Sequence, residues 1–115
     1  MAQTTLRNRG NFQSFNTHVR NAIINGSASA SLEDEINYRM GDVQIALLVF
    51  ERYSVMGSNR VSLSVMVTGQ GDDLAVSAVA SGGSEAVLFK INTFGEEAFL
   101  EKFNQAVVQF RSIDK

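Results

Sequence analysis

Asp34 and Glu51 are the two carboxylates best placed to do acid–base chemistry, because they interrupt the apolar phases of two adjacent segments that alternate like β-strands. In the hairpin register argued below they are near neighbours. If both were buried, each would raise the pKa of the other, as in a catalytic pair. The favoured alternative is that this end of the hairpin lies in solvent or that a β-bulge turns both outward, where Arg52 and Arg60 can pair with them.

His18 is the chain's single histidine, and it borders an apolar stripe, three residues after Phe15 and four before Ala22. A general base needs a positioned partner, which a sequence cannot show. We therefore favour a structural contact for His18 and keep ligand binding as the alternative. With one histidine and no cysteine, no metal site is predicted.

The Ser81-Gly82-Gly83-Ser84 run has the composition of a phosphate-binding loop, and Lys90 follows it. Such loops usually open a helix, whereas this one is predicted to connect two strands. A plain turn is favoured, with a small-anion site as the weaker alternative. No nucleophile elbow, Walker loop or dinucleotide motif is present, so the sequence gives no positive reason to assign an enzyme, and no cofactor is expected.

Apolar residues recur at three- and four-residue steps in two segments, which predicts two amphipathic helices. The first spans about 11–25, with Asn11 as N-cap and Gly26 as a left-handed C-cap. The second runs to about 111 after a capping box formed by Thr93 and Glu96. Its apolar stripe consists of Phe99, Leu100, Phe103, Val107 and Phe110.

Between the helices the period changes to two, which predicts strands. A two-residue turn at 41–42 joins strands at about 27–40 and 43–55 and pairs Met40 with Val43 and Tyr38 with Ile45. The apolar sets of these two strands then share one face, which we assign to the core. Turns at 56–60, 69–73 and 81–84 separate the remaining predicted strands, which cover 61–68, 74–80 and 87–91.

The predicted fold is therefore a single α+β domain over residues 1–115. Its order is α-β-β-β-β-β-α, an antiparallel five-stranded meander with the N-terminal and C-terminal helices packed on one face.

Residues 45–50 are apolar at every position, so this strand is hydrophobic on both sides. Two helices on one face leave the other face without cover, and an exposed apolar face usually marks an interaction site. We predict that this face joins two copies of the chain. The alternatives are one helix on each face, a sheet that closes on itself, or a groove for an apolar ligand. The predicted interface consists of Ala46, Leu48, Phe50, Met66, Ala75, Val79 and Leu88.

The chain has 115 residues and a formal net charge of −2, with its ten Lys and Arg scattered. This argues against a general nucleic-acid or anionic-membrane binder. No apolar run approaches the length of a membrane helix, and the first residues lack the features of a signal peptide. A cytoplasmic location is expected.

Several stretches resemble a small bacterial family, domain of unknown function 6054. They are 27–32, 49–53, 59–63, 81–84 and the helix start at 94–97. The resemblance covers nearly the whole chain and implies a small single-domain bacterial protein, but it brings no catalytic residues. The predicted function is a non-enzymatic binding or assembly module that forms homo-oligomers. A dimer is the expected oligomer. The alternative is a small-ligand sensor or enzyme with its site between the first helix and the sheet, or near residues 81–84.

Overall fold

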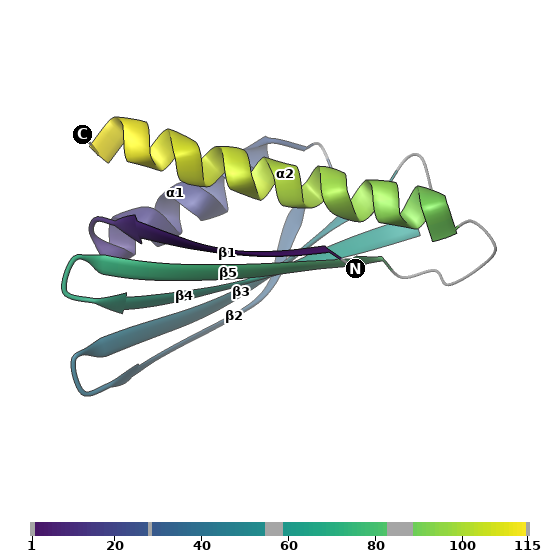
Figure 1. Cartoon of the computed structure of the whole chain (residues 1–115). Coiled ribbons are helices and arrows are strands. Elements are labelled where there is room, and N and C mark those ends of the chain that lie inside the picture. Colours follow the sequence, from purple (N-terminus) through teal and green to yellow (C-terminus); the bar gives the residue numbers. More distant parts are fainter. Residues whose placement is uncertain (1, 28, 55–58, 83–88, 115) are drawn as a thin grey trace.

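The computed structural model describes residues 2–27, 29–54, 59–82 and 89–114, and for residues 54, 59, 89–96 and 111–114 only the backbone. The strands are β1 (Ala2–Arg9), β2 (Ser31–Met40), β3 (Val43–Ser54), β4 (Asn59–Gln70) and β5 (Asp73–Gly82). The helices are α1 (Phe12–Asn25) and α2 (Phe89–Asp114). The strands form one antiparallel sheet in the order β1-β5-β4-β3-β2 (Figure 1).

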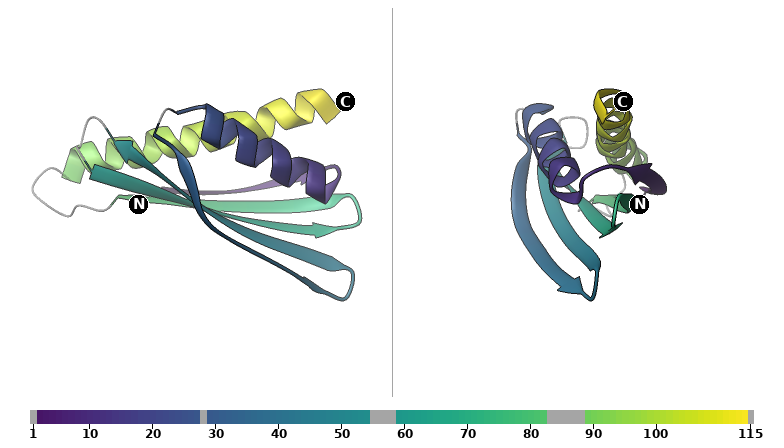
Figure 2. Two further views of the ribbon diagram at one scale, coloured as in Figure 1. Left: turned by 180° about the vertical axis from the view of Figure 1, so that it is seen from behind. Right: turned by 90° about the vertical axis from the view of Figure 1, so that its left-hand side faces the viewer.

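The predicted α+β fold, with a five-stranded antiparallel sheet and two helices on one face, is confirmed. The two helices lie beside each other on the same side of the sheet (Figures 1 and 2). Strands β2 to β5 form the predicted meander, and the hairpin register pairs Met40 with Val43 and Tyr38 with Ile45 as expected. Gly41 makes this tight turn possible because its φ of 62° is costly for other residues.

The fifth strand is not where the sequence predicted it. It is β1, which precedes α1 and pairs with β5, so that Leu6 lies opposite Val76. Of the strand predicted at 87–91, Phe89 and Ile91 begin α2 instead, and Val87 lies outside the described residues. Three alternating apolar residues are too few to distinguish a strand from a helix. Strand β1 escaped detection because Leu6 is its only large aliphatic residue.

The helix ends agree only partly with the prediction. Asn11 is the N-cap of α1, and its side chain accepts a hydrogen bond of 2.9 Å from the Ser14 backbone N–H. Gly26 is the C-cap, but its φ of −83° is right-handed and not left-handed as predicted. Helix α2 begins four residues before Thr93, so Thr93 lies inside the helix and the predicted capping box is wrong.

One hydrophobic core lies between the helices and the sheet. From the helices it takes Phe12, Phe15, Val19, Ile23, Phe99, Phe103, Val107 and Phe110. From the sheet it takes Ala46, Leu48 and Phe50 of β3, Val61, Leu63, Val65 and Val67 of β4, and Leu74, Val76, Ala78 and Ala80 of β5. The core phases predicted for β4 and β5 are therefore confirmed, whereas the phase predicted for β3 is reversed.

The pairing of β3 with β4 is the cause of this reversal. Leu48 lies opposite Val65 and Phe50 opposite Leu63, and opposed residues point to the same face. The valines of β4 pack under the helices, so the even-numbered residues of β3 pack there too. The odd-numbered residues of β3 consequently face the other way.

Candidate functional site

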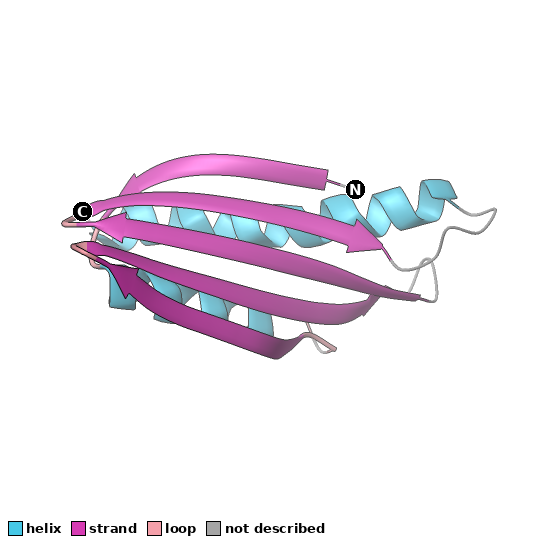
Figure 3. Cartoon of the chain, turned by 90° about the horizontal axis from the view of Figure 1, so that it is seen from below, coloured by secondary structure: helices cyan, strands magenta, loops and turns pink. Residues whose placement is uncertain are grey.

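The face of the sheet that the helices leave uncovered is the most unusual surface of the molecule. Seen from below, all five strands lie in front and both helices lie behind them (Figure 3). The strand register places eleven apolar residues on this open face. They are Ile36, Tyr38 and Met40 of β2, Val43, Ile45, Leu47, Val49 and Tyr53 of β3, Met66 of β4, and Ala75 and Val79 of β5.

Strand β2 contributes the most exposed part of this surface. Ile36, Tyr38 and Met40 are 49%, 54% and 67% exposed. The opposite side of the same strand carries Glu35 and Arg39, and it is turned toward the helices. An amphipathic edge strand in a protein that works as a monomer would gain stability from the reverse orientation, because its apolar side would then be buried.

The apolar residues gather on the β2–β3 half of the open face. The β4–β5 half carries Ser62, Ser64, Thr68, Ser77 and Ser81, and some of these bond to one another, as Ser62 Oγ does to Ser81 Oγ at 3.1 Å. Charged side chains stand toward the two ends. One end has the exposed Arg9–Asp73 pair, and the other has Arg60 and Glu51. Arg7 of β1 and Asp34 of β2 also lie on this face, so only the middle of the inner strands β3, β4 and β5 is uncharged.

The predicted interface residues divide into two groups. Met66, Ala75 and Val79 lie on the open face, as the sequence placed them. Ala46, Leu48 and Phe50 do not, since all three are fully buried under the helices of the same chain, and their assignment to the uncovered face was wrong. Leu88 lies outside the described residues.

A groove between α1 and the β2–β3 hairpin is a second candidate site. It has a volume of about 320 Å³ and is lined mainly by polar side chains of α1 and β2. Within it Arg20 Nη2 donates to Glu35 Oε2 at 2.7 Å, and Asn37 Nδ2 donates to the same oxygen at 2.8 Å. Asn16 also lines this groove and is only 3% exposed.

His18 has the structural contact that the sequence favoured. Its Nε2 lies 2.8 Å from the backbone oxygen of Ala106, and because a carbonyl can only accept, Nε2 carries the proton. The ring also packs against Phe110 at a centroid distance of 5.5 Å. His18 therefore joins α1 to α2, and its role as a ligand-binding residue stays a prediction.

Asp34 and Glu51 do not form a buried catalytic pair. A β-bulge between Leu32 and Asp34 shifts the register, and Asp34 is exposed. Arg60 Nη2 lies 2.8 Å from Glu51 Oε1, so Glu51 has a surface ion pair. This outcome matches the favoured alternative of a bulge with an arginine partner, and it removes the strongest acid–base candidates.

The predicted anion loop cannot be assembled from the described residues. Ser81 and Gly82 end β5, whereas Gly83, Ser84 and the side chain of Lys90 lie outside the described part of the chain. Among the residues that the structure does describe, no three His, Asp or Glu side chains group closely enough to hold a metal ion.

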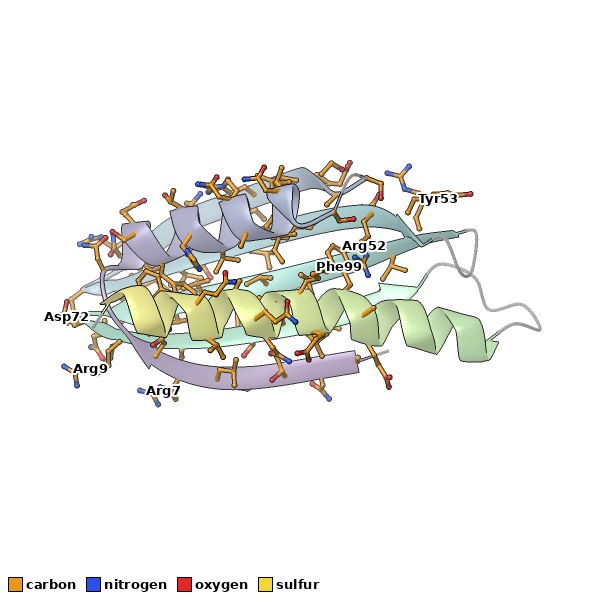
Figure 4. All side chains as sticks on the ribbon, turned by 90° about the horizontal axis from the view of Figure 1, so that it is seen from above. Arg7, Arg9, Arg52, Tyr53, Asp72 and Phe99 are labelled. Carbon is orange, nitrogen blue, oxygen red and sulfur yellow. The ribbon has the colours of Figure 1, made fainter. Side chains whose placement is uncertain are left out.

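Arg52 lies on the helix side of β3, with its guanidinium carbon 4.7 Å from the centre of the Phe99 ring (Figure 4). Burial lowers the pKa of Arg52 from its ordinary value, because desolvation disfavours the charged form. An arginine stays charged at physiological pH even so. This contact stabilises the junction of sheet and α2 as a cation–π pair.

A family model described as a family of unknown function matches residues 1–111. The chain belongs to the DUF6054 family. This confirms the resemblance found in the sequence, and it assigns no activity to any residue. Comparison with curated proteins and with solved structures gave no significant match.

For this DUF6054 protein, the described helices include none with both the length and the hydropathy needed to cross a bilayer. The surface that sequence reasoning missed is the outward side of the β2–β3 hairpin, especially Ile36, Tyr38, Ile45 and Leu47. The hairpin register was correct, so the residues were grouped correctly but assigned to the wrong face.

Proposed function

We propose that this DUF6054 protein is a non-enzymatic assembly module that forms a homodimer through the open face of its sheet. The observation that carries the proposal is the orientation of β2, which turns Ile36, Tyr38 and Met40 away from its own core. A protein gains nothing as a monomer from exposing these side chains, whereas an apolar surface over adjacent strands is typical of an interaction site.

The size of the face suits a partner of the same kind. Strands of about ten residues at about 3.3 Å per residue, in five rows about 4.8 Å apart, give a surface of roughly 800 Å². A partner that covered the whole face would bury about what each side contributes to a stable protein–protein interface, and a partner centred on β3 would bury less. Two sheets can pack face to face with their apolar side chains interdigitated, as in a β-sandwich.

The distribution of charged side chains on the open face favours a second copy of the chain as its partner. The middle of the inner strands β3, β4 and β5 carries no charged side chain, and Arg7 and Asp34 lie on the outer strands β1 and β2. Two identical faces can therefore meet around a two-fold axis without burying like charges against each other at the centre. The serines and threonines of β4 and β5 and the charges at the ends supply a polar rim, as most interfaces have. The apolar centre lies around Leu47, so the axis is expected to pass near β3.

Light scattering after gel filtration tests the proposal at micromolar concentration. The wild type is expected to be a dimer. Leu47→Glu should give a folded monomer, because Leu47 is on the open face and a charge there would be desolvated on association. Gln3→Glu is the matched control: it adds the same charge at the exposed β1 margin of the same face and should leave the dimer intact.

Tyr38→Glu provides a second test on an edge strand, where the side chain is already half exposed and the fold tolerates change. It should also give a monomer with an unchanged circular dichroism spectrum. A wild type that stays monomeric at these concentrations would overturn the proposal, as would dimers that both open-face variants leave intact.

A further inference from the structure

The side of β2 that faces the helices carries polar side chains, and the proposed dimer does not explain them. Glu35, Asn37 and Arg39 point toward the helices, yet they line a groove and not a core. Asn16 faces them from α1, and it is the one buried polar residue found among the described residues. An apolar side chain at this helix position would extend the stripe formed by Phe12, Phe15 and Val19.

Asn16 is not satisfied within the described part of the chain. Its Oδ1 is buried and has no hydrogen-bond partner there. Leaving a buried polar atom unpaired costs about 1–3 kcal/mol. A half-turn of the terminal amide exchanges the oxygen and nitrogen, so Asn16 can meet either a donor or an acceptor that enters the groove.

The charges of the groove indicate what could enter. Arg20 and Glu35 neutralise each other in a partly buried pair at 2.7 Å. Arg39 lines the same groove and has no ion-pair partner among the described residues. The lining therefore carries one net positive charge. Both hydrogen bonds to Glu35 end on Oε2, which leaves Oε1 able to accept another.

We propose that this groove binds a small organic acid with an amino or hydroxyl group on the carbon next to its carboxylate. Arg39 binds the ligand carboxylate, since the planar guanidinium matches the geometry of a carboxylate. Asn16 and Glu35 Oε1 accept hydrogen bonds from the amino or hydroxyl group of the ligand. A volume of about 320 Å³ is at the small end of the range for metabolite pockets. Asn16, Glu35 and Arg39 lie on the opposite side of β2 from the proposed dimer interface, and only Tyr38 and Ile45 of the groove lining belong to both surfaces. The proposed ligand contacts do not use these two residues.

Thermal unfolding in the presence of a ligand panel tests this site. The panel holds α-amino acids, α-hydroxy acids, and acetate, which has a carboxylate but no neighbouring donor. At least one amino or hydroxy acid should raise the Tm by several degrees at about a hundredfold excess over its Kd, and acetate should not. A response to amino acids alone assigns the donor as an ammonium group, and a response to hydroxy acids alone assigns it as a hydroxyl.

Two variants locate the binding. Arg39→Gln changes an exposed side chain and should abolish the ligand-dependent rise in Tm while leaving the unliganded Tm unchanged. Asn16→Leu should also abolish it but raise the unliganded Tm, because it removes an unpaired polar atom. Asn104→Leu is the matched control: Asn104 also has an unpartnered Oδ1 but lies on α2 outside the groove, so this variant should keep the response.

The absence of any ligand response would overturn the proposal, and so would an equal response to acetate, which would indicate a general anion effect. A response that persists in both Arg39→Gln and Asn16→Leu would place the binding elsewhere and would overturn it too.

Discussion

At the scale of single residues, the contacts of His18 explain how two helices that are far apart in the sequence are held together. The imidazole joins the α2 backbone at Ala106, and beside it the rings of Phe15 and Phe110 meet edge to face at 5.1 Å. A polar contact and an aromatic contact thus fix the same crossing. This is a structural role, and it needs no ligand.

Replacing His18 with leucine should lower the free energy of unfolding by about 1 kcal/mol, the usual contribution of one hydrogen bond. Urea unfolding measures the difference. Thr17→Ala, on the exposed neighbouring position of α1, should change it by less than about 0.5 kcal/mol. Equal stability of His18→Leu and the wild type would show that the bond to Ala106 adds nothing.

Gly69 is a second residue with a specific role, because α1 begins directly above it. A Cβ at position 69 would lie 2.7 Å from Cδ1 of Phe12. Gly69→Ala should therefore push the Phe12 ring out of place and lower stability by about 1–3 kcal/mol. In the double variant with Phe12→Leu the additional effect of the alanine should shrink, and a double-mutant cycle by urea unfolding measures that coupling.

At the scale of secondary-structure elements, β3 shows how neighbouring residues of one strand acquire different roles. Leu48 is fully buried beneath the helices, and Leu47 faces the open side. The two have the same chemistry and adjacent positions. Only the alternation of the strand and its pairing with β4 separate them.

The pair Leu47→Glu and Leu48→Glu tests this assignment directly. Leu48→Glu should unfold the protein, since an unpaired carboxylate in the core costs about 4 kcal/mol or more. Leu47→Glu should keep a cooperative thermal transition near that of the wild-type fold. Circular dichroism and differential scanning calorimetry distinguish the two, and unfolding of both variants would mean that both faces of β3 are buried in one protomer.

At the scale of the whole molecule, both helices pack on the same face of the sheet, so only that face is covered. The two helices occupy one face and the strands form the other (Figures 2 and 3). The apolar residues of the open face are concentrated on β2 and β3, so a symmetric partner would be centred there and would reach β1 only at its edge.

Because the chain has no cysteine, single-cysteine variants can map this arrangement without background. Packed sheets lie about 10 Å apart, which is too far for a direct disulfide, so a short bismaleimide is the suitable reagent. Leu47→Cys should give crosslinked dimers in high yield. Gln3→Cys should give them in low yield. Similar yields at both positions would argue against an axis near β3.

Much of the fold is determined locally and could be predicted. The stripe that begins at Phe12 and Phe15 defined α1, and Asn11 capped it as expected. Gly41 and the alternation on either side of it defined the register of the β2–β3 hairpin. Local patterns also favoured a bulge or an arginine partner over a catalytic pair for Asp34 and Glu51, and the structure has both.

The composition of the open face was decided only by the tertiary structure. Both sides of β3 are apolar, so its own sequence cannot choose which side is buried. A five-residue turn at 56–60 would pair Val55 with Val61 and put odd-numbered residues of β3 with the valines of β4. The structure pairs Ser54 with Asn59, across four residues. The two registers differ by an odd number of residues, so every side chain of the strand points to the other face. The sequence by itself determined that both sides of β3 would be apolar. The tertiary structure determined that both helices cover one face (Figure 2), and long-range strand pairing determined which residues the other face would display.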